Sequence, residues 1–186
     1  MRLFVAVSPG VDVVRRIDHV VQAIRGKAPS AKWVKPDNLH LTLAFLGERP
    51  ESDVPSLSEA LSRVAASHAP FDLHFQGGGG FGRPSRPRVL WIGCEGDTES
   101  LSSLQRDVGE ALSPLGFVPE RRDFAAHLTL ARARDQAGDP ALFRCVESLE
   151  REDFGAVRVD HLTLFESRLS PAGATYVAVY KATLKS

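Results

Sequence analysis

The sequence predicts an α+β fold in two lobes, and three observations support this prediction. The pentapeptide His-Leu-Thr-Leu-Ala occurs at residues 40–44 and again at 127–131, and its alternation is typical of a β-strand. The two copies lie close to half the chain apart, which indicates two lobes of similar build. Helical and strand-like patterns alternate along the rest of the chain. We therefore expect two pseudo-symmetric lobes, each an antiparallel sheet with outer helices, around a central cleft with one His-x-Thr-x motif per lobe.

The remaining elements follow from hydrophobic periodicity. A strand is predicted over residues 2–8, and a helix over 11–26, where apolar residues repeat at helical spacing. Residues 35–38 form a turn before the first histidine strand. Further helices are predicted over 52–67, 98–115 and 139–150, with Ser52 or Asp53 capping the first of them. Further strands are predicted over 70–76, 87–93, 154–165 and 173–184.

A glycine-rich run separates two of these strands. Residues 77–82 read Gly-Gly-Gly-Gly-Phe-Gly, which resembles the composition of a phosphate-binding loop. No Gly-Lys-Ser or Gly-Lys-Thr follows, and no helix is predicted to begin there. We expect a flexible connector between strands.

Length and composition are those of a soluble globular protein. The 186 residues fit one domain over 1–186, and no linker or low-complexity segment divides them. The two cysteines, Cys94 and Cys145, stand among apolar neighbours in no metal-ligand spacing, so we expect buried small side chains. No apolar run is long enough for a signal peptide or a membrane span, which predicts a cytoplasmic protein. Nothing indicates a coiled coil or an exposed apolar helix, so a monomer is expected.

Charge restricts any nucleic-acid partner to a local site. Lys plus Arg equals Asp plus Glu at 23 each, so the protein has no global field that attracts polyanions. Arginines nevertheless cluster along the chain, at positions 83, 86 and 88, at 121 and 122, and at 132 and 134. A basic cleft with brief binding is the arrangement this pattern allows.

The two histidine strands place an imidazole beside a hydroxyl. Strict alternation puts His40, Thr42 and the closing Ala44 on one face, with Phe45 and the leucines on the other. In the second copy His127 and Thr129 share a face in the same way. An imidazole exists in both protonation states near neutrality, so two of them can act as acid and base on a phosphodiester. The threonine hydroxyls can donate to phosphate oxygens.

A third copy begins at His161 but ends in Phe165 rather than alanine. Phe165 would share the face of His161 and Thr163 and crowd a ligand. We interpret this strand as structural. The histidines of the first two copies have a structural alternative of their own, as half-exposed sheet residues.

At this point the chain resembles a known family. Residues 38–47, Asn-Leu-His-Leu-Thr-Leu-Ala-Phe-Leu-Gly, and 126–132, Ala-His-Leu-Thr-Leu-Ala-Arg, resemble the paired His-x-Thr-x motifs of the 2H phosphoesterases. More narrowly, the chain resembles the bacterial and archaeal RNA 2′,3′-cyclic phosphodiesterases, also called 2′-5′ RNA ligases. Supporting matches include Trp-Val-Lys-Pro at 33–36, Phe-Gly at 81–82 and Pro-Arg-Val-Leu-Trp at 87–91. The resemblance implies a bilobal fold and no catalytic role for His161.

The resemblance also implies an activity, namely hydrolysis of RNA 2′,3′-cyclic phosphate ends to 2′-phosphomonoesters without metal or other cofactor. Expected partners are RNA ends, tRNA halves among them, or nucleotides, and no membrane. Reversible ATP-independent 2′-5′ ligation is a further activity of the family. Two alternatives stay open: a phosphodiesterase for small cyclic nucleotides, and a non-catalytic RNA-end-binding protein.

Roles can then be assigned to residues. We expect His127 to activate water and His40 to protonate the leaving oxygen, although the sequence leaves the reverse assignment open. Thr42 and Thr129 are the expected phosphate-binding residues. Arg134 is a candidate phosphate or base contact because the family has an arginine there, whereas alternation points both it and Arg132 away from the site. Phe45 is a candidate for stacking on a base, with a core position as its alternative.

Overall fold

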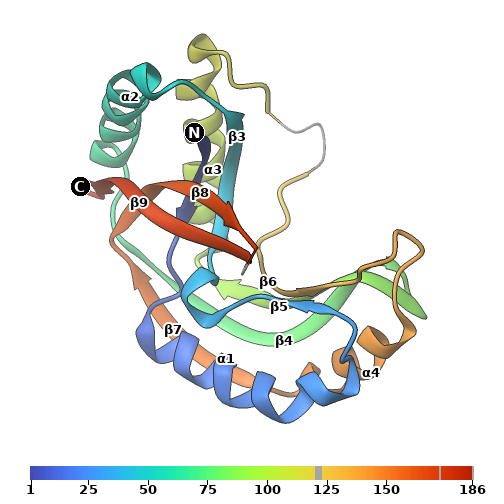
Figure 1. Cartoon of the computed structure of the whole chain (residues 1–186). Coiled ribbons are helices and arrows are strands. Elements are labelled where there is room, and N and C mark those ends of the chain that lie inside the picture. Colours follow the sequence, from blue (N-terminus) through green and yellow to red (C-terminus); the bar gives the residue numbers. More distant parts are fainter. Residues whose placement is uncertain (120–122, 172, 186) are drawn as a thin grey trace.

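The computed structural model describes residues 1–119, 123–171 and 173–185, which form two antiparallel sheets with helices on their outer faces (Figure 1). The strands are β1 (Arg2–Val7), β2 (Lys32–Trp33), β3 (Leu41–Glu48), β4 (Phe71–Arg83), β5 (Arg86–Gly96), β6 (His127–Arg132), β7 (Asp153–Val159), β8 (His161–Ser170) and β9 (Gly173–Thr183). The helices are α1 (Val11–Ile24), α2 (Val54–Ala66), α3 (Thr98–Leu112) and α4 (Pro140–Leu149). Short 3₁₀ helices lie at Arg25–Lys27, Pro36–Asn38, Glu51–Asp53 and Ser113–Leu115.

Each sheet belongs to one lobe, and each lobe carries one histidine strand. The upper lobe of Figure 1 contains the sheet β3-β1-β8-β9, on which α2 and α3 pack. The lower lobe contains the sheet β2-β6-β5-β4-β7, covered by α1 and α4. Leaving aside the two-residue strand β2, the histidine strands β3 and β6 occupy corresponding edges of the two sheets. The predicted α+β fold with two similar lobes is confirmed.

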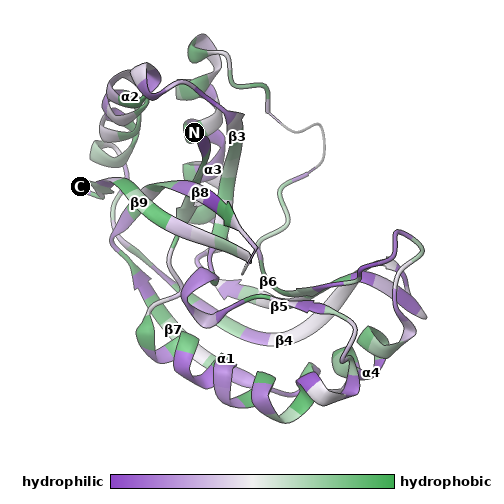
Figure 2. Ribbon diagram, in the orientation of Figure 1, coloured by the Kyte–Doolittle hydropathy of each residue, from purple (hydrophilic) through white to green (hydrophobic). Residues whose placement is uncertain are grey.

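The helices form where the periodicity predicts them. In α1 the residues Val13, Ile17, Val21 and Ile24 recur every three or four positions and are buried, and Figure 2 shows α1 as alternating hydrophobic and hydrophilic bands. The carboxylates that precede α3 and α4 cap them through backbone N–H groups. No helix in the three described ranges is long and apolar enough to cross a membrane.

The predicted flexible connector at 77–82 is wrong, because these residues continue β4 and pair with β5. The glycines make room for side chains that pack on both faces of the strand. A Cβ atom on Gly78 would lie 2.6 Å from Leu149, and one on Gly79 would lie 2.3 Å from the Trp91 ring. The hairpin turn comes later, at 84–85.

The single strand predicted over 154–165 is also wrong. It is two strands, β7 in the lower sheet and β8 in the upper sheet, separated at Asp160. Apolar residues stand on both sides of Asp160, because β7 buries Val159 and β8 buries Leu162 and Leu164. The chain therefore crosses between lobes without an obvious break in sequence.

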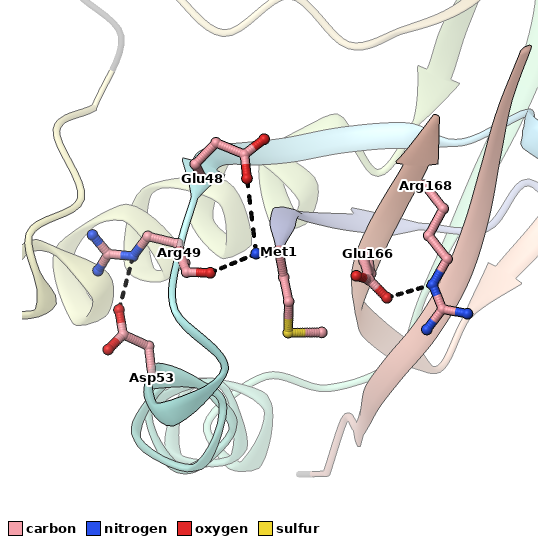
Figure 3. A network of polar contacts seen from close by, with 6 residues as sticks. All are labelled: Met1, Glu48, Arg49, Asp53, Glu166 and Arg168. Atoms are coloured by element: carbon pink, nitrogen blue, oxygen red, sulfur yellow. Dashed lines mark hydrogen bonds and ion pairs between the residues drawn. The ribbon is translucent and has the colours of Figure 1, made fainter. Parts of the chain in front are cut away.

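A polar network fixes the outer end of β3 (Figure 3). The Met1 ammonium donates to the Arg49 carbonyl at 2.7 Å and lies 3.8 Å from the Glu48 carboxylate. The Arg49 Nε pairs with Asp53 at 3.2 Å, so Asp53 is held by an ion pair instead of capping α2 with its side chain. These contacts join the start of β1, the end of β3 and the start of α2.

Candidate active site

Both histidine strands contain a β-bulge three residues after the histidine. In the pairing of β3 with β1, Thr42 lies opposite Ala6 and Ala44 opposite Val5, so Leu43 is the extra residue. In the pairing of β6 with β5, Thr129 lies opposite Trp91 and Ala131 opposite Leu90, so Leu130 is the extra residue. A bulge breaks the two-residue alternation, so side chains beyond it change face.

The bulges correct the faces predicted from strict alternation. Phe45 lies on the cleft side with His40 instead of opposite to it, and its side chain is 58% exposed. Ala44 and Ala131 are buried in the hydrophobic core, and Ala44 also borders the cleft cavity. Arg132 is exposed, as expected, but its side chain lines the cleft rather than an outer surface.

The two imidazoles are held in the same way. The Nδ1 atom of His40 lies 2.6 Å from the Asn38 carbonyl oxygen, and that of His127 lies 2.6 Å from the Ala125 carbonyl oxygen. A carbonyl oxygen only accepts, so Nδ1 carries the hydrogen and donates in both rings. Each neutral ring therefore keeps its lone pair on Nε2, which is free to take a proton, and each protonated ring can donate from the same atom.

Aromatic rings support each imidazole. His40 contacts Phe4 and Tyr176, with ring centroids 4.8 and 5.0 Å away. His127 contacts Phe81 edge-on at 4.9 Å and lies 6.5 Å from Trp91. The contacts with Tyr176, Phe81 and Trp91 are edge-to-face, which fixes ring orientation as well as position, whereas the Phe4 ring is tilted at 40° to His40.

The two histidines and Arg132 form one electrostatic neighbourhood. Burial is the largest influence on His40 and lowers its pKa from the ordinary 6.5. The hydrogen bond to the Asn38 carbonyl raises this pKa, while the positive charges of Arg132 and His127 lower it. Without an anion in the cleft, His40 is therefore neutral at neutral pH.

A cavity of about 820 Å³ opens between the lobes beside these residues. Thr42, Phe45, His127 and Arg134 line it, four of the side chains predicted for the site. This volume is large enough for a nucleotide. His40 packs against Phe4 and Tyr176. Neither His40 nor Thr129 is among the described residues that line this cavity.

Arg134 stands at the edge of the cleft. Its Nε donates to the Ser30 carbonyl at 2.8 Å, a bond that does not use the terminal guanidinium nitrogens, and the residue lines the cavity. Asp123, which precedes β6, also borders this cavity. The predicted arginine pair 121–122 lies outside the described residues.

The third histidine copy has a different setting. The Nδ1 atom of His161 bonds to the Asp160 carboxylate, and Thr163 is buried. Phe165 stacks on Phe4 with centroids 5.2 Å apart, on the cleft side of the upper sheet. His161 is not among the described residues that line the cavity.

The site offers no metal-binding cluster in the part of the chain that the structure describes. No three His, Cys, Asp or Glu side chains come together there in a way that could hold a metal ion.

Cys145 is buried, whereas Cys94 is half-buried, and burial raises the pKa of the Cys94 thiol to about 12. Neither cysteine lines the cleft cavity as far as the described residues show.

The sequence analysis assigned no role to several residues that build the site. Asn38 donates through Nδ2 to the Ala174 carbonyl at 2.8 Å and so ties the turn before His40 to β9. Tyr176, Phe81 and Trp91 hold the imidazoles, and each comes from a different strand. Their contacts with the histidines are long-range, and no local spacing signals them.

Comparison with known proteins agrees with the geometry. A model of the 2′-5′ RNA ligase superfamily matches residues 13–170. The chain belongs to this superfamily, and the resemblance drawn from its two His-x-Thr-x motifs is confirmed. A protein of Archaeoglobus fulgidus named RNA 2′,3′-cyclic phosphodiesterase is 38% identical over 176 residues, covering 95% of this chain and 96% of that protein.

Relatives of known structure share the whole fold. The crystal structure of TT0787 from Thermus thermophilus superposes with a TM-score of 0.79 at 31% identity, covering 100% of this chain and 98% of that one. E. coli LigT complexed with 3′-AMP gives a TM-score of 0.79 at 26% identity with the same coverage.

Proposed function

We propose that this protein is an RNA 2′,3′-cyclic phosphodiesterase that hydrolyses cyclic phosphate ends of RNA to 2′-phosphomonoesters. The observation that carries the proposal is the matched pair of Nδ1–carbonyl bonds of 2.6 Å at His40 and His127. These bonds leave the Nε2 atom of each ring available for proton transfer. The name carried by the Archaeoglobus fulgidus relative supports the same activity.

The proposed reaction uses His127 as base and His40 as acid. Nε2 of His127 takes a proton from water while the water oxygen bonds to phosphorus. The bond between phosphorus and the ribose 3′ oxygen breaks, and Nε2 of His40 gives that oxygen a proton. The product carries a 2′-phosphate and a 3′-hydroxyl, and the two histidines have exchanged protonation states. Neither a metal nor another cofactor is needed for this balance.

The substrate itself prepares the acid. The lowered pKa of His40 opposes the protonated form in the free protein. A phosphodiester bound between the rings brings a negative charge that raises this pKa. His40 would then take up its proton as the substrate binds. In the reverse assignment His40 would have to be neutral at the moment of reaction, so the same rise in its pKa would oppose catalysis.

Four further residues complete the proposal. Thr42 and Thr129 hold the non-bridging phosphate oxygens, where charge develops in the transition state. Arg134 contacts the phosphate or the base from the cavity edge. Phe45 offers an exposed ring for base stacking.

Ligation is the second candidate activity, and the family to which the chain belongs supports it. The 5′-hydroxyl of a second RNA, such as the other half of a cleaved tRNA, would replace water in the same step. His127 would take the proton of that hydroxyl, and the displaced 3′ oxygen would again receive one from His40. The product is a 2′-5′ phosphodiester, and the step is reversible because no ATP is consumed.

The test uses a short RNA ending in a 2′,3′-cyclic phosphate, incubated with purified protein in EDTA. We expect a 2′-phosphate product from the wild type and from His161→Ala, and its loss from His40→Ala and His127→Ala. His161→Ala is the matched control, because it removes the same side chain from the third copy of the motif.

Four outcomes would count against the proposal. Activity abolished by EDTA would exclude the metal-free chemistry. A His161→Ala variant that folds but is inactive would mean that the wrong pair of strands was chosen. Wild-type protein that binds the RNA end without forming product would favour a non-catalytic RNA-end-binding protein. Turnover confined to small cyclic nucleotides would favour a phosphodiesterase for those nucleotides.

A further inference from the structure

A second cavity, of about 810 Å³, lies next to the candidate active site. We call it the basic groove and define it by Arg25, Lys32, Trp33, Lys35, Arg132 and Arg134, which line it. Arg132 and Arg134 also line the first cavity, so the two spaces meet at these side chains. Tyr176, whose ring contacts His40, and Asn38, whose carbonyl holds His40, form the wall nearest the site.

The groove concentrates positive charge, although the formal net charge of the chain is zero. Its five cationic side chains face no Asp or Glu among the described residues that line it. In the ranges 1–119, 123–171 and 173–185, none of the five forms an ion pair with a carboxylate. The first cavity differs, since two carboxylates, Asp123 and Asp135, border it together with four phenylalanines.

One backbone pairing makes this concentration unfavourable in the free protein. Lys32 on β2 lies directly opposite Arg132 on β6. Side chains of directly opposed residues share one face of a sheet, and like charges in that position repel. An anion between them removes the repulsion. The groove is therefore a place where a bound polyanion improves an otherwise poor arrangement.

The covalent structure of an RNA end suits two cavities around one reacting phosphate. The terminal ribose carries the cyclic phosphate at its 2′ and 3′ oxygens, the base at C1′, and the rest of the strand through its 5′ oxygen. With the cyclic phosphate between the histidines, the base and the strand leave in different directions. The phenylalanine-lined cavity suits a base, and the basic groove suits a phosphate backbone.

We propose that the basic groove binds the upstream phosphates of the RNA strand, so that an oligonucleotide end, rather than a mononucleotide, is the preferred substrate. This inference rests on the proposed function. Lys32 and Lys35 are the residues that distinguish the two substrates, because they line the groove and not the first cavity. Arg132 and Arg134 line both cavities, so their substitution cannot distinguish the two substrates.

The experiment compares 2′,3′-cyclic AMP with a tetranucleotide RNA carrying the same cyclic end. For the wild type we expect kcat/KM to be at least about tenfold higher for the tetranucleotide. In Lys32→Gln/Lys35→Gln this ratio should fall about tenfold. The slope of log kcat/KM against log salt for the tetranucleotide should become shallower by about 1.4, which corresponds to two lost single-strand phosphate contacts. Lys185→Gln, an exposed lysine outside both cavities, is the matched control and should keep the wild-type ratio.

Binding separates this inference from the proposed function. Fluorescence anisotropy with a 5′-labelled tetranucleotide measures the groove whether or not the RNA is cleaved, and thermal unfolding verifies that the double variant is folded. Equal binding by the double variant and the wild type, or an unchanged substrate ratio, would refute RNA binding by the basic groove, even where hydrolysis occurs. Lysine-dependent binding without any hydrolysis would support the groove and refute the proposed catalysis instead.

Discussion

The close approach of Gly79 to Trp91 leads to a quantitative prediction about the support of His127. The two residues lie opposite each other in β4 and β5, and the Trp91 ring extends across the glycine. A Cβ atom at Gly79 would lie 2.3 and 2.5 Å from two ring carbons, whereas ordinary contact begins at 3.4 Å. In Gly79→Ala the ring must therefore retreat by about 1 Å. Its centroid lies 5.4 Å from Phe81 and 6.5 Å from His127, so we expect the displacement to be transmitted to the His127 imidazole.

We expect Gly79→Ala to lower the free energy of unfolding by about 1–3 kcal/mol, the usual cost of overpacking. We also expect kcat/KM to fall by roughly 10- to 100-fold, since a displacement of about 1 Å can cost a factor of about 100. Urea unfolding gives the first quantity and hydrolysis of the cyclic-phosphate RNA gives the second. Gly26→Ala is the stability control, because a Cβ atom there meets nothing within 4 Å.

A double-mutant cycle tests the stated cause. Trp91→Leu replaces the ring with a smaller side chain, so the alanine at position 79 should cost less in that background than in the wild type. Additive effects of the two substitutions would refute the steric explanation. So would a Gly79→Ala variant as stable as Gly26→Ala.

The remaining predictions concern titration, positioning and substrate contact. Because the folded-state pKa of His40 is lowered, the unfolded chain binds more protons than the folded chain between that pKa and pH 6.5. The contribution of His40 to folding stability is therefore complete above pH 6.5 and is lost as pH falls through the lowered pKa. Urea unfolding across this range should show a smaller decline for His40→Phe. In pH–rate profiles, the pKa assigned to His40 should be higher in kcat than in kcat/KM, and equal values would contradict uptake of the proton with substrate. Asn38→Ala removes the 2.8 Å bond to the Ala174 carbonyl and should cost about 1 kcal/mol of stability and lower kcat. Phe45→Ala should raise KM for the RNA by roughly 5- to 150-fold, from about 1–3 kcal/mol of lost stacking, whereas Phe143→Ala on α4, an exposed phenylalanine outside both cavities, should not.

The sequence predicted those parts of the fold whose signal is local. The helices were found within a few residues because α1 and its counterparts repeat apolar residues at helical spacing. The histidine strands were found because polar and apolar residues alternate in them. The glycine run was misread because glycine shows no such periodicity, and the reason for it lies in Trp91 and Leu149, which are distant along the chain.

The faces of the strand residues could not be predicted past the bulges. Nothing in His-Leu-Thr-Leu-Ala indicates that Leu43 and Leu130 are extra residues, because a bulge is set by pairing with a neighbouring strand. The candidate pair His40 and His127 precedes the bulges, so the error did not reach it. Phe45 and Arg132 follow the bulges, and their orientations were predicted incorrectly.

The two lobes give the histidines equivalent geometry but unequal surroundings. Each imidazole is fixed by a carbonyl two residues before it and by two aromatic rings, and each strand bulges three residues after it. Yet His40 lies against Phe4 and Tyr176, and Asn38 anchors its turn to β9, whereas His127 borders the open cavity beside Phe81. A general acid and a general base need the same reach to the reacting phosphate but opposite protonation states at the moment of reaction. Duplicated strands supply the first requirement, and because different side chains pack around the two rings, the second can be met without any difference between the motifs themselves.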